Sequence, residues 1–158
     1  MKNSLLVLEG IRKSFGARHI LDITRFELAA GESYVLTGEN GSGKTTLLRV
    51  LAGLDDAEVG ACRYEGRPFD LHTYPKWLRH DVIYVHQHPY LFRSSIVDNI
   101  SYGLKARGMA ASACEPLVRD AIAWAGVGDL LDVPPHSLSG GEKQRVALAR
   151  ARVLHPRL

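Results

Sequence analysis

The feature that most constrains this chain is a glycine-rich run between Gly38 and Thr46, which reads Gly-Glu-Asn-Gly-Ser-Gly-Lys-Thr-Thr. The run fits the pattern G-x-x-x-x-G-K-[ST]. The apolar, β-prone segment 33–37 precedes it and the helix-forming segment 47–52 follows it. A strand, a glycine-rich loop and a helix in this order are typical of a phosphate-binding loop, because the helix N-terminus attracts anions. The alternative, a chance match, does not explain the flanking elements.

The residues of the loop predict separate contacts with a nucleoside triphosphate. We expect Gly38, Gly41 and Gly43 to adopt positive φ, so that backbone amides approach the phosphates without a Cβ in the way. These amides would converge on the β-phosphate at the helix start. Lys44 would reach the β- and γ-phosphate oxygens, and Thr45 would offer its hydroxyl to Mg²⁺. The other predicted nucleotide-binding residues of the loop are Asn40, Ser42 and Thr46.

Composition excludes several classes of function. A length of 158 residues with 46% hydrophobic residues suits one domain with a substantial core. The net charge of +3 and the lack of a Lys/Arg block argue against nucleic acid as a partner. Cys62 and Cys114 lie far apart without metal-ligand spacing, which predicts reduced thiols in the cytosol. No apolar run approaches the roughly 18 residues of a spanning helix, so a membrane role would require a partner.

The remaining sequence divides into a strand-rich first part and a helical second part. Strand-like composition marks five segments: 5–11, 20–28, 33–37, 61–65 and 81–85. Helical composition marks three segments after Pro89: 95–104, 110–125 and 142–154. This order predicts an α/β fold in which the glycine-rich loop belongs to the first part.

A second segment that could bind an anion precedes the last predicted helix. Leu138 to Arg145 reads Leu-Ser-Gly-Gly-Glu-Lys-Gln-Arg. Ser139, Gly140 and Gly141 place bare amides and a hydroxyl at a helix N-terminus, which would form a second anion site without a lysine. The alternative is an ordinary serine N-cap after a glycine turn.

The two segments together resemble the ATP-binding-cassette (ABC) family, whose signature motif L-S-G-G-[QE]-x-Q-R is matched at every position. The stretch 84–87, Tyr-Val-His-Gln, resembles the Q-loop of the family, with Gln87 as its glutamine. Phe15 stands where the family places an aromatic ring that stacks on adenine. From the residues alone, Phe15 could instead belong to the core and Gln87 to the surface.

The resemblance implies a fold and its subdivision. The expected fold is a P-loop NTPase core with an antiparallel β subdomain and a small helical subdomain, lacking the C-terminal part of the core. A single incomplete ATP-binding domain would cover 1–158, in three parts: the β subdomain and phosphate-loop core over 1–88, the helical subdomain over 89–136, and the signature motif with its helix over 137–158.

The resemblance also implies a site shared by two subunits. In such proteins the subunits dimerise head to tail, and the phosphate loop of one holds ATP. Ser139, Gly140 and Gly141 of the other subunit would then cap the γ-phosphate. Gln87 would contact Mg²⁺ or the attacking water, which makes it both a catalytic residue and a metal ligand beside Thr45. The expected cofactors are therefore ATP and Mg²⁺.

The chain stops at residues 153–158, where the family's Walker B strand begins. The Mg²⁺-linked aspartate, the catalytic glutamate and the switch histidine of that family are missing, and no acidic residue follows Glu142. Phosphoryl transfer depends on metal charge and on a group that orients the attacking water. We therefore expect the chain as written to bind nucleotide, to hydrolyse it very poorly, and to be truncated before a central strand.

The expected function is the ATP-binding, energy-coupling subunit of an ABC membrane transporter, cytoplasmic and peripheral on the inner face of the cell membrane. Segment 95–108 resembles importer subunits for oxyanions such as molybdate or tungstate, for sulfate or for polyamines. The implied partners are a second nucleotide-binding subunit, transmembrane permease subunits and, indirectly, a solute-binding protein. One alternative is a DNA-repair or chromosome-maintenance ATPase, against which the short spacing from Gln87 to Ser139 argues. A translation-associated cassette protein, which normally carries two cassettes, is the other alternative.

Overall fold

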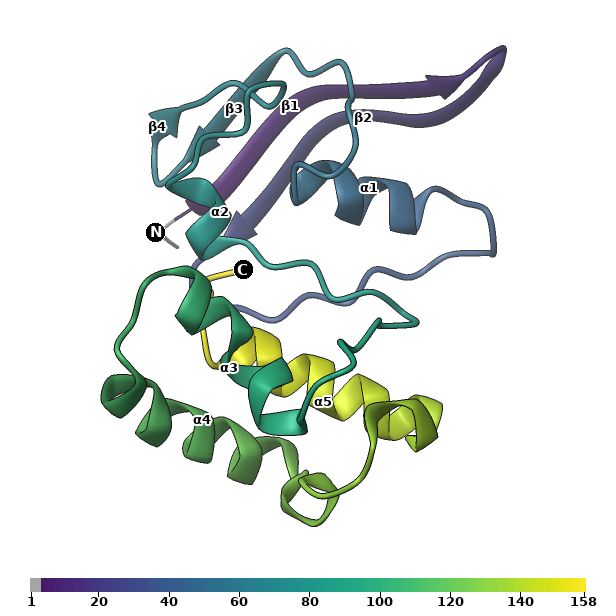
Figure 1. Ribbon diagram of the computed structural model, residues 1–158. Helices are drawn as coiled ribbons and strands as arrows, with labels where there is room; N and C mark the ends of the chain where they lie inside the picture. The colour runs from purple at the N-terminus through teal and green to yellow at the C-terminus, as the bar shows by residue number, and fades with distance from the viewer. Residues whose placement is uncertain (1–3) are drawn as a thin grey trace. The chain divides into compact units, whose positions relative to one another are not determined.

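The computed structural model describes residues 4–158, which form two compact units (Figure 1). The first unit extends to Tyr84 and includes Arg157, and the second runs from Val85 to Pro156. No helix in residues 4–158 has the length and apolar character that crossing a bilayer requires. The finer subdivision at residues 88 and 136 stays a prediction.

The first unit contains a four-stranded antiparallel sheet with the order β2-β1-β3-β4. Strands β1 (Ser4–Phe15) and β2 (Arg18–Ala29) form a long hairpin, and Gly16 in its turn has a φ of 57°, which glycine adopts readily. Strand β3 (Ala61–Tyr64) pairs with the other edge of β1, and β4 (Arg67–Pro68) pairs with β3. The two strands of the hairpin are therefore the longest in this sheet.

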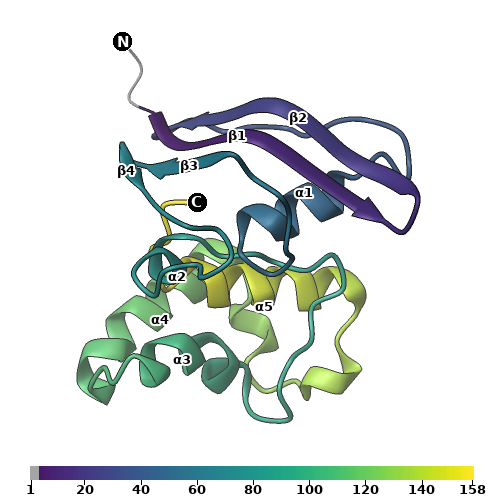
Figure 2. The same cartoon turned by 90° about the horizontal axis from the view of Figure 1, so that it is seen from above.

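Helix α1 (Lys44–Leu51) lies against this hairpin, as both views show (Figures 1 and 2). It buries Leu47, Val50 and Leu51, which are spaced three and four residues apart and so share one face. Leu6 and Leu8 of β1 are 1% and 0% exposed and contribute to the same core. This packing fixes the start of α1, where the glycine-rich loop ends.

The second unit is helical. Its main elements are α3 (Ile96–Ala106), α4 (Ala111–Ala125) and α5 (Gly140–Arg152), joined by the short 3-10 turns η1 (Gly128–Leu130) and η2 (Pro135–Ser137). Their apolar faces meet in one cluster of buried residues. Its fully buried members include Ile96, Ile100, Val127 and Val146. The antiparallel sheet and the small helical unit agree with the expected α/β fold, and the three predicted helices form within a few residues of their expected bounds.

Two of the five predicted strands do not form. Segments 33–37 and 81–85 are irregular, except that Asp81 ends the short helix α2 (Leu78–Asp81). Tyr34, Val35 and Leu36 are 54%, 87% and 41% exposed. A strand persists only when a neighbour pairs with its backbone N–H and C=O groups. Within residues 4–158 the sheet offers these segments no such neighbour, so their β propensity is not realised.

Candidate nucleotide-binding site

The glycine-rich loop has the backbone conformation that the sequence predicts. Gly38, Gly41 and Gly43 have φ values of 146°, 82° and 89°. L-residues with a side chain rarely adopt this region, so glycine suits all three positions. At Gly43 space is limiting as well, because a Cβ would lie 2.9 Å from the carbonyl oxygen of Ile20 in β2. The end of the loop is thus fitted closely against the hairpin.

Lys44 folds back over this loop. Its Nζ donates hydrogen bonds to the carbonyl oxygens of Gly38 and Glu39, both at 2.7 Å. The Oγ of Ser42 lies 3.5 Å from the same nitrogen. The ammonium is therefore held at the loop backbone rather than extended into solvent, and it gives the loop a full positive charge.

The start of α1 adds a partial positive charge. Gly43 is its N-cap residue and provides no side-chain cap, and the first turn contains no acidic residue. The first amides of such a helix point outwards unpaired, and the helix dipole favours an anion there. The exposed hydroxyl of Thr45 follows directly, where a cation bound to that anion could be reached. These residues fit a triphosphate with Mg²⁺, and the exposed Asn40 lies in the same loop.

Phe15 lies at the end of β1 and its side chain is not part of the core. The residue is 55% exposed, which excludes the core alternative. The Nζ of Lys13 lies 5.2 Å from the ring centroid, close enough for a cation–π contact. The exposed ring is accessible to a second planar group. Stacking of adenine on this ring stays a prediction.

The second predicted anion site lies at the start of α5 in the helical unit. Ser139 is the N-cap residue, and its Oγ accepts a hydrogen bond from the Glu142 amide at 3.3 Å. In return, the Ser139 amide donates to Oε2 of Glu142 at 2.7 Å, which completes a capping box. Hydrogen bonds to the Glu142 carboxyl from the side chain and the backbone of Ser139 lower the pKa of that carboxyl. Gly140 and Gly141 are exposed, so their amides are accessible.

The N-cap alternative for Ser139 is thus correct, and the anion-capping role of the same hydroxyl stays a prediction. Glu142 was not among the predicted site residues, although the spacing S-x-x-E could have revealed the capping box.

Gln87 is exposed in an irregular segment of the helical unit. The predicted residues therefore divide between the units: Phe15 and the glycine-rich loop belong to the first unit, and Gln87 and residues 139–141 belong to the second.

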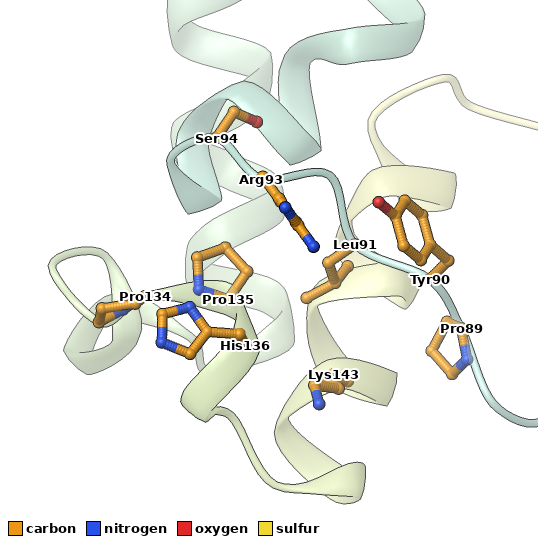
Figure 3. Close-up of a pocket in the computed structure, with 9 residues that line it drawn as sticks. All are labelled: Pro89, Tyr90, Leu91, Arg93, Ser94, Pro134, Pro135, His136 and Lys143. Atoms are coloured by element: carbon orange, nitrogen blue, oxygen red, sulfur yellow. The ribbon is translucent and has the colours of Figure 1, made fainter.

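A hollow of about 710 Å³ lies within the helical unit, between the segment that follows Gln87 and the start of α5 (Figure 3). Tyr90, Leu91 and Arg93 line it from the first of these elements, and Lys143 lines it from α5. His136 of η2 completes a lining with three basic side-chain types and no carboxylate. Its shape depends on how the first segment is held against α5.

Comparisons with known proteins agree with the geometry of the loop. The profile of the ABC transporter family matches residues 21–158. The tungstate uptake system ATP-binding protein TupC of Peptoclostridium acidaminophilum is 34% identical over 152 residues, 96% of this chain and 68% of the relative. The molybdate/tungstate import ATP-binding protein WtpC of Thermococcus kodakarensis is 37% identical over 155 residues, 98% of this chain and 46% of the relative.

A solved structure extends the likeness to three dimensions. The structure of cbiO1 from Clostridium perfringens, part of the ABC transporter complex cbiONQ, matches with a TM-score of 0.85 at 28% identity. It covers 98% of this chain, which corresponds to 63% of that protein. The chain therefore spans between about half and two-thirds of the length of these proteins.

Proposed function

Because the chain belongs to the ABC transporter family, we propose that it is the ATP-binding, energy-coupling part of a membrane importer. The observation that carries this proposal is the uncapped start of α1, preceded by a loop with three positive-φ glycines and closed over by Lys44. Relatives that bear import or uptake names, TupC and WtpC among them, support the direction of transport.

The first unit would bind the triphosphate. The amides of the loop and of the α1 start would contact phosphate oxygens, and Lys44 would exchange carbonyl acceptors for phosphate oxygens. The hydroxyl of Thr45 would hold Mg²⁺, which, when bound, neutralises developing charge on the phosphates. The exposed ring of Phe15 would stack on adenine and orient the nucleotide.

The second unit would close the site in trans. A single helix start presents amides to one side of a triphosphate only, so a second anion-binding helix start is needed to enclose it. Residues 139–141 of a second copy would supply that start through the amides of Gly140 and Gly141 and the hydroxyl of Ser139. Gln87 would contact Mg²⁺ or orient the attacking water. Two copies would thus form two composite sites.

This function implies further partners. Transmembrane permease subunits would receive the closing motion, and a solute-binding protein would deliver cargo to them. The chain would act in the cytoplasm, bound to the inner face of the membrane through these subunits. We propose neither a nucleic-acid partner nor a direct contact with lipid.

Binding at the loop is tested with Lys44→Ala and isothermal calorimetry with Mg·ATP. Loss of a charge-assisted contact to phosphate should weaken binding about a hundredfold or more. Lys76→Ala removes an exposed lysine of the same unit outside the loop and should leave the affinity unchanged. Equal affinity of Lys44→Ala and the parent chain would refute the assignment of the loop.

Closure in trans is tested with Ser139→Asn and Ser139→Asp, because both side chains cap a helix well and differ in charge. Both variants should bind Mg·ATP as monomers with the affinity of the parent chain. Dimerisation driven by a non-hydrolysable ATP analogue, followed by sedimentation, should persist in Ser139→Asn and be lost in Ser139→Asp, whose carboxylate repels the γ-phosphate. Dimerisation of Ser139→Asp that is as strong as that of Ser139→Asn and of the parent chain would contradict the capping role.

A further inference from the structure

The segment from Pro89 to Ser95 connects Gln87 to α3 and has no regular secondary structure. It nevertheless carries Leu91, which is buried at 7% exposure, between the exposed rings of Tyr90 and Phe92. An irregular segment needs partners outside its own backbone to keep one conformation. Two side chains from two different helices provide them.

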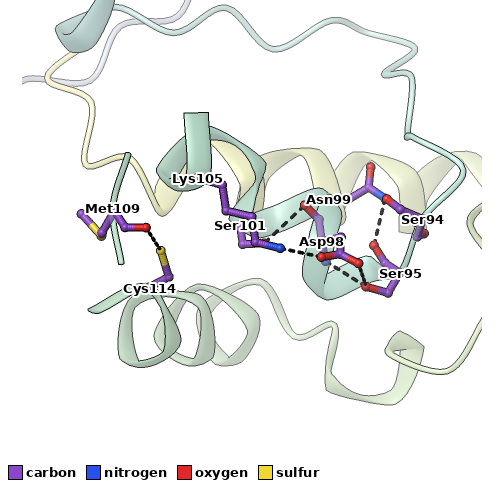
Figure 4. A network of polar contacts seen from close by, with 8 residues as sticks. All are labelled: Ser94, Ser95, Asp98, Asn99, Ser101, Lys105, Met109 and Cys114. Atoms are coloured by element: carbon purple, nitrogen blue, oxygen red, sulfur yellow. Dashed lines mark hydrogen bonds and ion pairs between the residues drawn. The ribbon is translucent and has the colours of Figure 1, made fainter. Parts of the chain in front are cut away.

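The first partner is Asn99 of α3, which is 0% exposed. Its Oδ1 accepts a hydrogen bond from the Phe92 amide at 2.8 Å, and its Nδ2 donates to the Phe92 carbonyl oxygen at 3.1 Å. The same Nδ2 also donates to the Ser95 carbonyl oxygen at 3.0 Å and lies within reach of Ser94, its neighbour in Figure 4. The amide of Asn99 therefore pairs with Phe92 as a neighbouring strand would.

The second partner is Arg150 of α5. Its Nη2 donates a hydrogen bond to the Tyr90 carbonyl oxygen at 3.0 Å, and its guanidinium carbon lies 5.7 Å from the centroid of the Phe92 ring. Arg150 is half-buried, and this burial lowers its pKa. Within residues 4–158 no carboxylate forms an ion pair with Arg150, and the contacts of its guanidinium are those with the segment.

Helix α5 is suited to transmit a displacement from its start at Ser139 to Arg150 near its end. It runs without interruption from the capping box at Ser139 to Arg152, and Arg150 lies about three turns, roughly 16 Å, along its axis from Ser139. Val146 and Ala149 are 0% exposed, which embeds the helix in the core of its unit. A displacement of the Ser139 end is therefore carried to Arg150 with little bending.

We propose that Arg150 is a positioning residue that makes the segment from Tyr90 to Ser95 move with α5 when residues 139–141 cap a nucleotide. Asn99 fixes the other end of that segment to α3. As a result, the two walls of the hollow in Figure 3, Tyr90 to Arg93 on one side and Lys143 on the other, keep a constant spacing. This role rests on the proposed function, because it requires a nucleotide to be capped at Ser139.

The test compares Arg150→Met with Arg152→Met. Arg152 is a matched control, because it lies on the same helix and stacks on an aromatic ring, that of Trp124 at 5.3 Å, without contacting the segment. Hydrogen–deuterium exchange is measured on peptides that cover 89–96 and 138–145, with and without a saturating Mg-bound non-hydrolysable ATP analogue. Without nucleotide, Arg150→Met should raise exchange in 89–96 about tenfold through loss of a hydrogen bond to a charged donor. Arg152→Met should change it less than twofold.

With the analogue, both peptides should become protected in the parent chain and in Arg152→Met, whereas Arg150→Met should protect 138–145 only. Arg150→Lys, which can still reach the Tyr90 carbonyl, should restore part of the response in 89–96. Should Arg150→Met fail to fold, Phe92→Leu removes the ring beneath the guanidinium while keeping α5 intact, and it should weaken the same response.

The outcomes separate the two ideas. If peptide 89–96 responds to the analogue in Arg150→Met as it does in the parent chain, the role of Arg150 is overturned and the proposed function stands. If calorimetry detects no Mg·ATP binding to the parent chain, the proposed function itself fails, and the role of Arg150 fails with it.

Discussion

Replacing Gly43 by alanine tests whether the loop is fitted to the hairpin as described. Gly41 provides the matched control, because its φ of 82° is close to the 89° of Gly43. A side chain at either position should cost about 1–2 kcal/mol of stability in that conformation. At Gly41 the nearest atom to a new Cβ would be the flexible Arg18 Nη2, at 3.8 Å. At Gly43 it would be the Ile20 carbonyl oxygen, at 2.9 Å, with Cδ2 of Leu21 at 3.0 Å.

The backbone oxygen at Gly43 cannot move aside cheaply, so overpacking should add about 1–3 kcal/mol. We therefore expect Gly43→Ala to destabilise the first unit by about 2–5 kcal/mol and Gly41→Ala by about 1–2 kcal/mol. Urea unfolding followed by Trp77 fluorescence in a Trp124→Phe background reports on that unit alone. Equal losses of unfolding free energy in the two variants would refute the close fit of Gly43 against β2.

Two further predictions concern side-chain hydrogen bonds. Because hydrogen bonds from Ser139 lower the pKa of Glu142 in the folded chain, the capping box should stabilise α5 above the usual carboxyl pKa and be lost as pH falls through the lowered value. The protection factor of the Glu142 amide, in which the pH dependence of intrinsic exchange is divided out, should therefore fall in acid, and Glu142→Gln, which keeps an acceptor without titrating, should abolish that dependence. The Tyr64 hydroxyl, in a residue 2% exposed, donates to Oδ2 of Asp81 at 2.9 Å, so Tyr64→Phe should lower the unfolding free energy by about 1–2 kcal/mol. Tyr102→Phe, at a residue 54% exposed, should leave it unchanged, and equal losses in the two would contradict the reasoning.

The sequence predicted those elements whose stability is encoded locally. Helix α1 follows from apolar residues at Leu47, Val50 and Leu51, which mark one face whatever lies opposite. Strands β1 and β2 contain the predicted strand segments 5–11 and 20–28, but their extension into a hairpin with a turn at Gly16 was not predicted. Segments 33–37 and 81–85 have equally good strand composition, yet a strand also needs a paired neighbour, which composition does not reveal.

The site shows the same division. The positive φ values at Gly38, Gly41 and Gly43 were predictable because the motif itself requires them. The roles of Asn99 and Arg150 were not, since each depends on tertiary contacts with an irregular segment that carries no motif of its own. An asparagine and an arginine on helices normally read as surface residues, and only burial and hydrogen bonding distinguish these two.

The exposed run from Tyr34 to Leu36 has a practical consequence for handling the chain. Three consecutive exposed apolar residues, which pair with no strand of the sheet within residues 4–158, form a template onto which another copy can add. The flanking carboxylates of Glu32 and Glu39 act as gatekeepers by mutual repulsion between copies. Salt screens that repulsion, so concentrated solutions of the chain should stay clear longest at low ionic strength and precipitate as β-rich aggregates when salt is raised.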